Sequence, residues 1–130
     1  MPNLTFDHYT IKVKNLDESA AFYRDIVGLE EIRNRTEKTY IRWFSIGDGE
    51  LHVVEGNTSP IKTTVGIHLA LKTSDLDTVI SRLKSKNILL HDSKGTPHSL
   101  TYRADGVRQI YFQDPDGYWI EVNEAETVEG

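Results

Sequence analysis

The stretch His8-Tyr-Thr-Ile-Lys-Val-Lys-Asn-Leu-Asp17 occurs a second time, 60 positions later, as His68-Leu-Ala-Leu-Lys-Thr-Ser-Asp-Leu-Asp77. The alignment needs no gap and pairs a histidine, a lysine, a leucine and an aspartate in the two copies. A repeat of this length predicts one supersecondary unit built twice. Because each copy begins with a metal-capable side chain, the repeat concerns chemistry as well as architecture.

Each copy is predicted to begin with a strand and to continue into a helix. Polar and apolar residues alternate from Phe6 to Val13 and from Gly66 to Thr73, which is typical of half-buried strands. Apolar residues then recur at helical spacing as far as Gly28 in the first copy, and as far as about Asn87 in the second. Asn15 or Asp17, and Asp75 or Asp77, can cap these helices.

Three further strands are predicted in each half. In the first half they are residues 30–36, Thr39 to Ile46 and Glu50 to Glu55; in the second they are Ile88 to Asp92, Arg108 to Gln113 and Tyr118 to Asn123, with a loop from Ser93 to Gly106. The predicted fold class is α+β, with two βαβββ modules in a pseudo-twofold arrangement that form a curved mixed sheet around a cleft. We expect one domain over residues 1–130, with modules at about 4–56 and 64–124, a linker at about 57–63 and a tail at 125–130.

Composition excludes several classes of function. The chain has 130 residues, enough for one domain with a full core, and a net charge of −5 with interspersed signs, which disfavours binding to nucleic acid or to an anionic membrane. The absence of cysteine excludes disulfides, thiolate metal sites and cysteine nucleophiles. No signal peptide or membrane-spanning run is evident, so a cytoplasmic protein is predicted.

Strand alternation singles out four metal-capable side chains. His8 and His68 lie on the polar faces of the first strands, and His52 and Glu121 lie on the last strands of the two halves. If these faces meet across a pseudo-twofold axis, the four side chains converge. Three imidazoles and a carboxylate suit Zn, Ni, Fe, Mn or Co better than Ca or Mg, and they leave coordination positions open.

Other residues have plainer interpretations. A single histidine on a strand is more often structural than a ligand, and His91 and His98 are assigned to a strand end and a loop. The segment Asp114-Pro-Asp-Gly117 is first of all a turn. Four aromatic residues are interpreted as core or cavity wall and not as a platform for stacking nucleic-acid bases, because no basic stripe accompanies them: Trp43, Phe44, Tyr111 and Trp119.

Four segments together resemble the vicinal-oxygen-chelate superfamily, which includes glyoxalase I, fosfomycin-resistance proteins, extradiol dioxygenases, methylmalonyl-CoA epimerase and bleomycin-resistance proteins. The segments are Asp7 to Val13, Asn15 to Leu29, Gly66 to Leu71, and Val107 to Val122 with its Asp-Pro-Asp-Gly turn. The resemblance covers nearly the whole chain. It implies that His8, His68 and Glu121 are metal ligands and that His52 occupies a fourth ligand position, which resembles a Glu in glyoxalase I and a Gln in the epimerase.

The resemblance implies a glyoxalase-like, metal-dependent lyase or isomerase that acts on a small substrate chelating the metal through vicinal oxygens. Glu121 is then the catalytic base, with Glu50 a remote second candidate. Thr10, Trp43, Tyr111 and Trp119 are the expected substrate-binding residues. Fosfomycin-type thiol transferases resemble this chain in His8, Thr10, His68, Tyr111 and Glu121, but the cationic cluster that their substrate needs is not evident here. Dioxygenases of the same superfamily share the ligand set.

A bleomycin-resistance-like protein that binds its ligand without metal is the alternative from another class, with Trp43, Tyr111 and Trp119 as an aromatic wall. A scaffold with a vestigial site is a third possibility. We also expect a homodimer, because sheet edges need cover and members of this family commonly pair modules.

Overall fold

The computed structural model describes residues 2–56 and 61–125. The chain forms two compact units, Met1–Ile61 (unit 1) and Lys62–Gly130 (unit 2), each of which is described by itself. The predicted linker falls mainly on residues 57–60 and the predicted tail mainly on 126–130, outside the described residues. The prediction of a single domain stays a prediction.

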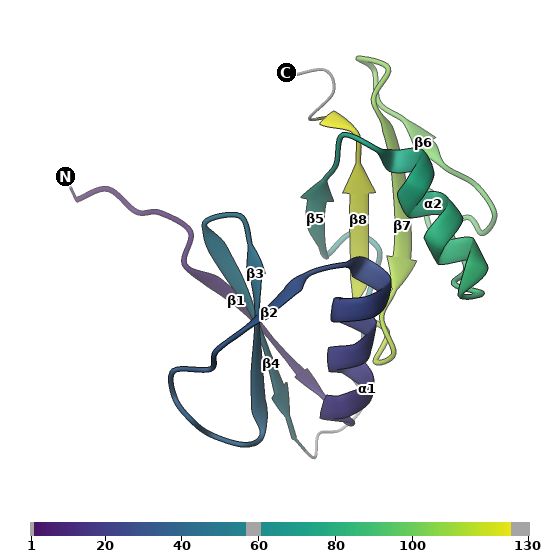
Figure 1. Cartoon of the computed structure of the whole chain (residues 1–130). Helices are drawn as coiled ribbons and strands as arrows, with labels where there is room; N and C mark the ends of the chain where they lie inside the picture. Colours follow the sequence, from purple (N-terminus) through teal and green to yellow (C-terminus); the bar gives the residue numbers. More distant parts are fainter. Residues whose placement is uncertain (1, 57–60, 126–130) are drawn as a thin grey trace. The chain divides into compact units, whose positions relative to one another are not determined.

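Unit 1 contains a four-stranded mixed sheet in the order β1-β4-β3-β2 (Figure 1). Its elements are β1 (His8–Val13), α1 (Leu16–Ala21), β2 (Glu30–Ile32), β3 (Ile41–Ile46) and β4 (Gly49–Glu55). The helix continues beyond α1 as a π-helical stretch, Phe22–Val27. Strand β1 pairs with β4 in parallel, and the other two pairings are antiparallel.

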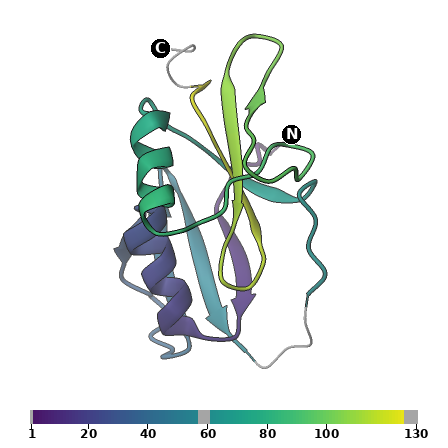
Figure 2. The same cartoon turned by 90° about the vertical axis from the view of Figure 1, so that its right-hand side faces the viewer.

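Unit 2 repeats this topology in the order β5-β8-β7-β6. Its elements are β5 (His68–Lys72), α2 (Leu76–Ser85), β6 (Thr101–Tyr102), β7 (Arg108–Gln113) and β8 (Trp119–Asn123). In each unit the helix lies on one face of the sheet (Figures 1 and 2). The α+β class and the two βαβββ modules are therefore confirmed, while their arrangement around a cleft stays a prediction.

Local sequence explains where the helices begin and end. The side chain of Asn15 accepts a hydrogen bond from the backbone N–H of Glu18, and Asp75 does the same for Thr78. These bonds satisfy backbone donors that a helix N-terminus leaves without partners. Gly28 ends the first helix in the left-handed region, with φ of 91°. Only glycine adopts this conformation without steric cost.

Strand alternation in unit 1 follows the predicted faces. Ile11, Val13, Leu51 and Val53 are buried, whereas His52 and Val54 on the opposite face of β4 are half-buried. Burying the aliphatic face against the helix is the main driving force for this packing. The opposite face of the sheet, which carries His52, does not pack against the helix.

Two strand predictions are wrong in detail. Ile88 to Asp92 forms no strand: His91 makes isolated bridges to Pro97 and Tyr111, and the short strand β6 lies inside the predicted loop. The strand predicted at residues 30–36 ends at Ile32. Beyond it, the Asn34 side chain accepts hydrogen bonds from the backbone and hydroxyl of Thr36, and this local turn competes with strand pairing.

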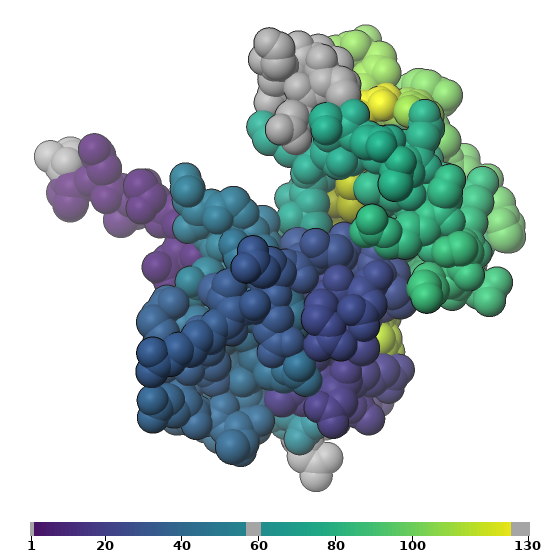
Figure 3. Space-filling model, in the orientation of Figure 1, coloured from purple at the N-terminus to yellow at the C-terminus, as the bar shows by residue number. Residues whose placement is uncertain are grey.

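The N-terminal segment projects from the sheet of unit 1 (Figures 1 and 3). Leu4 and Phe6 are 94% and 61% exposed. Phe6 nevertheless touches the start of β4, because a Cβ added to Gly49 would lie 2.3 Å from its ring. No helix in residues 2–56 or 61–125 is long and apolar enough to cross a membrane.

Candidate functional site

Strand register places His52 and Glu121 at equivalent positions in the two units. Thr10 on β1 is paired with His52 on β4, and Ala70 on β5 is paired with Glu121 on β8. Across the hairpins, His52 is opposite Trp43 and Glu121 is opposite Tyr111. His52 follows its partner Trp43 by nine residues and Glu121 follows Tyr111 by ten, so the two hairpins differ by one residue in their turns.

In unit 2, His68 and Glu121 form a close pair. Nε2 of His68 lies 3.1 Å from Oε1 of Glu121, and the Glu121 side chain is only 7% exposed. Nδ1 of His68 lies 2.7 Å from the carbonyl oxygen of Val65. Because a carbonyl only accepts hydrogen bonds, Nδ1 carries the proton in this bond. In the neutral ring, Nε2 then presents a lone pair to the carboxylate.

Three side chains donate hydrogen bonds to the buried carboxylate of Glu121. The Tyr111 hydroxyl bonds Oε1 at 2.8 Å, and the side-chain amides of Gln109 and Asn123 bond Oε2 at 3.0 and 2.6 Å. Burial, followed by the bond to Glu121, raises the pKa of Tyr111 and keeps its hydroxyl protonated. After these three hydrogen bonds, Oε1 keeps one lone pair that can accept a proton or bind a metal ion, and Oε1 lies next to Nε2 of His68.

The sequence did not identify Gln109 and Asn123 as site residues. Strand parity places Asn123 on the same sheet face as Glu121, and Gln109 on the same face as Tyr111, but it does not show that either side chain contacts the carboxylate. Their amides hold the carboxylate in one orientation. Such outer partners commonly orient metal-binding carboxylates.

In unit 1, the aromatic rings form a stacked column. The Trp43 and His52 rings are parallel within 3° at a centroid distance of 4.0 Å, and His8 stacks on His52 at 4.0 Å with an angle of 15°. The Arg35 guanidinium lies 4.4 Å from the centre of the Trp43 ring. The column brings together two of the four predicted ligands.

Each imidazole in the column also contacts a carboxylate. Nδ1 of His8 lies 2.5 Å from Asp7, and Nε2 of His52 lies 2.9 Å from Glu50. Hydrogen bonds from these rings lower the pKa values of Asp7 and Glu50. A neutral imidazole that donates through one nitrogen keeps the other as a lone-pair ligand, which is the usual state of a metal-binding histidine.

Glu50 is also paired with Arg35, 3.2 Å from its guanidinium. The carboxyl predicted as a remote second base is therefore part of a surface ion pair and a histidine contact. In the folded protein it is held as a carboxylate by both partners, His52 first.

The four predicted ligands thus occur as two pairs, His8 with His52 in unit 1 and His68 with Glu121 in unit 2. Among the described residues, neither unit by itself holds three histidine, aspartate or glutamate side chains in an arrangement that could bind one metal ion. The predicted four-residue centre stays a prediction.

The other predicted site residues are also divided between unit 1 and unit 2. Thr10 lies on β1 beside His52, and Trp43 lies in the aromatic column. In unit 2, Tyr111 bonds Glu121, and its ring meets His68 edge-on at 5.1 Å. The Trp119 ring instead meets His91 edge-on at 4.8 Å. His91 is therefore a packing partner of a predicted substrate-binding residue, and strand spacing alone did not indicate this.

The pair in unit 2 fits a divalent metal ion. Two ligand atoms bound at right angles by bonds of about 2.1 Å lie about 3.0 Å apart, close to the distance between Nε2 and Oε1. A proton shared by the two atoms gives a similar distance. The imidazole and carboxylate donors suit the transition metals that were predicted from the sequence.

Comparisons with known proteins agree with the fold and the motifs. Residues 5–122 match the glyoxalase/bleomycin resistance protein/dioxygenase superfamily. The fosfomycin resistance protein FosX of Listeria monocytogenes is 28% identical over 126 residues, which cover 94% of this chain and 90% of that protein. The manganese-dependent 2,3-dihydroxybiphenyl 1,2-dioxygenase of Geobacillus genomosp. 3 is 28% identical over 128 residues, which cover 90% of this chain and 35% of that enzyme.

A solved structure has a similar fold. It is a mutant of FosX from Listeria monocytogenes complexed with Mn(II) and 1S,2S-dihydroxypropylphosphonic acid, with a TM-score of 0.75 and 25% identity over 95% of this chain and 93% of that chain. The superfamily therefore includes members with divalent metals and small oxygen-rich ligands. This chain belongs to the glyoxalase/bleomycin resistance protein/dioxygenase superfamily, as the resemblance of its motifs indicated.

Proposed function

We propose that this protein is a metal-dependent enzyme of the lyase or isomerase type, acting on a small substrate that offers two neighbouring oxygens to a divalent metal. The observation that carries the proposal is the pair formed by His68 and Glu121. Its imidazole is oriented by Val65 and its carboxylate by Tyr111, and the two ligand atoms face each other at 3.1 Å. A pair supported in this way on both sides is typical of metal ligands.

His8, His68 and Glu121 would hold the metal, and His52 would be the fourth ligand. When bound, a divalent ion stabilises negative charge that develops on the substrate oxygens. The relatives named for manganese support a metal of this kind. In unit 1, the metal-ligand atoms would be the ring nitrogens that do not contact a carboxylate, Nε2 of His8 and Nδ1 of His52.

Glu121 is the proposed base. Unlike the carboxylates beside His8 and His52, it is buried, and its Oε1 is the atom that Tyr111 and His68 share. The protonated Tyr111 hydroxyl can steady the carboxylate in both protonation states, because a hydroxyl both donates and accepts hydrogen bonds. Gln109 and Asn123 donate hydrogen bonds to Oε2 and so hold the carboxylate with Oε1 directed toward His68.

Thr10, Trp43 and Trp119 are proposed to contact the substrate. We also propose a homodimer, because β1 and β5 each lie at the edge of a sheet and pair with only one strand of their own unit. Exposed strand edges commonly pair with a second chain. Light scattering at micromolar concentration tests this proposal, and a monomer would refute it.

Metal content tests the central proposal. The full chain, purified without a histidine tag, is expected to retain close to one divalent ion after dialysis against Mn²⁺, and His68→Ala and Glu121→Gln are expected to lose it. His98→Ala is the matched control, because His98 is a histidine in a loop and is not among the predicted ligands. Equal metal content in all of these proteins would overturn the proposal.

Turnover is then measured by NMR on a panel of small oxygen-rich compounds. Fosfomycin and 2,3-dihydroxybiphenyl belong in the panel because relatives carry these names. Activity that disappears with chelator and returns with metal supports the proposed enzyme. A protein that binds a panel compound equally well with and without chelator, and converts none of them, would instead be the metal-free binding protein.

A further inference from the structure

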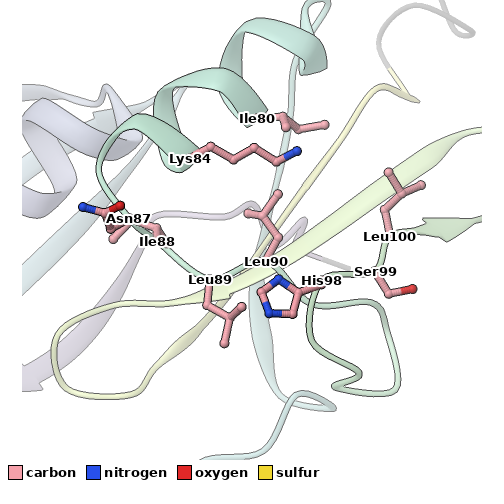
Figure 4. A pocket seen from close by; sticks show the side chains of 9 residues that line it. All are labelled: Ile80, Lys84, Asn87, Ile88, Leu89, Leu90, His98, Ser99 and Leu100. Atoms are coloured by element: carbon pink, nitrogen blue, oxygen red, sulfur yellow. The ribbon is translucent and has the colours of Figure 1, made fainter.

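Unit 2 contains a cavity that involves none of the predicted metal ligands. It has a volume of about 750 Å³ and lies between the C-terminal half of α2 and the chain from Asn87 to Leu100 (Figure 4). Nine residues line it: Ile80, Lys84, Asn87, Ile88, Leu89, Leu90, His98, Ser99 and Leu100. Its size falls within the range of small-molecule sites in proteins.

The walls of this cavity are aliphatic. Five of the nine lining residues are leucine or isoleucine, and none is a carboxylate. Figure 4 shows Ile80 and Lys84 reaching from α2 on one side, with Leu89, Leu90 and His98 on the other. An aliphatic wall favours an unbranched or branched hydrocarbon over a flat aromatic ring, which gains from stacking partners.

Lys84 supplies the one fixed positive charge of the lining. It forms no ion pair within the described ranges, in contrast to Arg42 and Arg108, which each contact two acidic residues. The stem of a lysine can lie along an apolar wall while its ammonium group stays at the rim. The cavity therefore combines a hydrocarbon surface with a single unpaired cation.

Hydrogen bonds hold the loop that lines one side of the cavity. His98 has φ of 59°, which is uncommon for a residue other than glycine, and its backbone N–H donates to the carbonyl of Leu90 at 2.8 Å. The Asp92 side chain accepts bonds from the backbone of Lys94 and Thr96. Backbone strain that surrounding bonds maintain is a feature of ligand sites, and these bonds form the wall before any ligand arrives.

We propose that this cavity binds a small aliphatic carboxylate. The hydrocarbon chain would lie against Ile80, Leu90 and Leu100, and the carboxylate would pair with the ammonium group of Lys84. The absence of any acidic lining residue removes the repulsion that would otherwise oppose an anion. This site is separate from the proposed metal centre and does not depend on it.

Octanoate is the probe for this proposal. Titration of the full-length, isotopically labelled protein with octanoate in the presence of chelator is expected to shift the amide NMR signals of the lining residues saturably. Lys84→Met keeps the length of the side chain and removes its charge. It is expected to weaken octanoate binding roughly tenfold, the effect of losing a hydrogen bond to a charged group.

Two controls separate the charge of Lys84 from general effects. Lys86→Met removes a charge from the same end of the helix at a position that does not line the cavity, and it is expected to bind octanoate as the parent does. Uncharged 1-octanol is expected to bind parent and Lys84→Met equally. The proposal is overturned if octanoate gives no saturable shift, if the shifts centre on His68 and Glu121, or if the two lysine variants behave alike.

Discussion

Tyr111→Phe removes one of the three side-chain hydrogen bonds to the Glu121 carboxylate, the one at Oε1. Tyr111 is 4% exposed, and its hydroxyl lies 2.8 Å from Oε1 of Glu121. Phenylalanine keeps the ring and its packing, so the substitution removes the hydroxyl without opening a large cavity. A hydrogen bond to a charged group contributes about 1.5–3 kcal/mol. We therefore expect unit 2 to lose about 2 kcal/mol of unfolding free energy, a factor of roughly 30 in its folding equilibrium.

The assay is urea unfolding at pH 7, followed by circular dichroism in excess chelator so that no metal contributes. Tyr102→Phe is the matched control, because Tyr102 is 67% exposed in the same unit, and its change is expected to stay within about 0.5 kcal/mol. In a Glu121→Gln background, Tyr111→Phe should cost less, because the acceptor is then neutral. A loss below about 0.5 kcal/mol for Tyr111→Phe in the parent would refute this reasoning.

Two further predictions concern stability. Arg108 donates to Glu124 at 2.8 Å and lowers the pKa of that carboxyl below its ordinary value of 4.5; the stabilisation is present above that value and is lost as the pH falls through the lowered pKa. Urea midpoints of the parent should therefore fall more steeply below about pH 5 than those of Glu124→Gln, and parallel curves would contradict this assignment. Gly28→Ala places a side chain at φ of 91° and should cost about 1–2 kcal/mol. Gly66→Ala, whose added Cβ meets only one atom at 3.9 Å, should change stability by less than about 0.5 kcal/mol, and equal losses in the two variants would show that φ is not the cause.

Most of the fold could be predicted because the repeat and the strand alternation carry the same information. The buried face of β4, with Leu51 and Val53, follows directly from period-two alternation. The helix boundaries at Asn15 and Gly28 follow from capping chemistry. These signals are local in sequence, so a single chain reveals them.

The predicted strand at Ile88 to Asp92 shows where local signals fail. Ile88, Leu89 and Leu90 form an apolar run that could belong to a buried strand, but in the structure they line the cavity beside α2. A short apolar run does not reveal whether it pairs with a neighbouring strand in a β-sheet or lines a cavity. The actual strand β6 has only two residues and is set by its pairing with Arg108 and Gln109, which is not local.

For the candidate site, the sequence indicated which positions of the two halves are equivalent, whereas the contacts in the structure join His8 with His52 and His68 with Glu121. Repeat position and strand parity were enough to relate His8 to His68 and His52 to Glu121. The supporting groups were missed because they depend on cross-strand register: Gln109 reaches Glu121 from the neighbouring strand, and the carbonyl of Val65 reaches His68 from the preceding turn. A spacing pattern does not contain such contacts.

The proposed metal ligands in unit 2 are the two atoms that face each other at 3.1 Å, Nε2 of His68 and Oε1 of Glu121. The most direct measurement is anomalous diffraction from crystals of the full chain grown with Mn²⁺. A single strong anomalous peak is expected within bonding distance of Nε2 of His68 and Oε1 of Glu121. No peak at this pair, with Nε2 and Oε1 still hydrogen-bonded at saturating Mn²⁺, would contradict it.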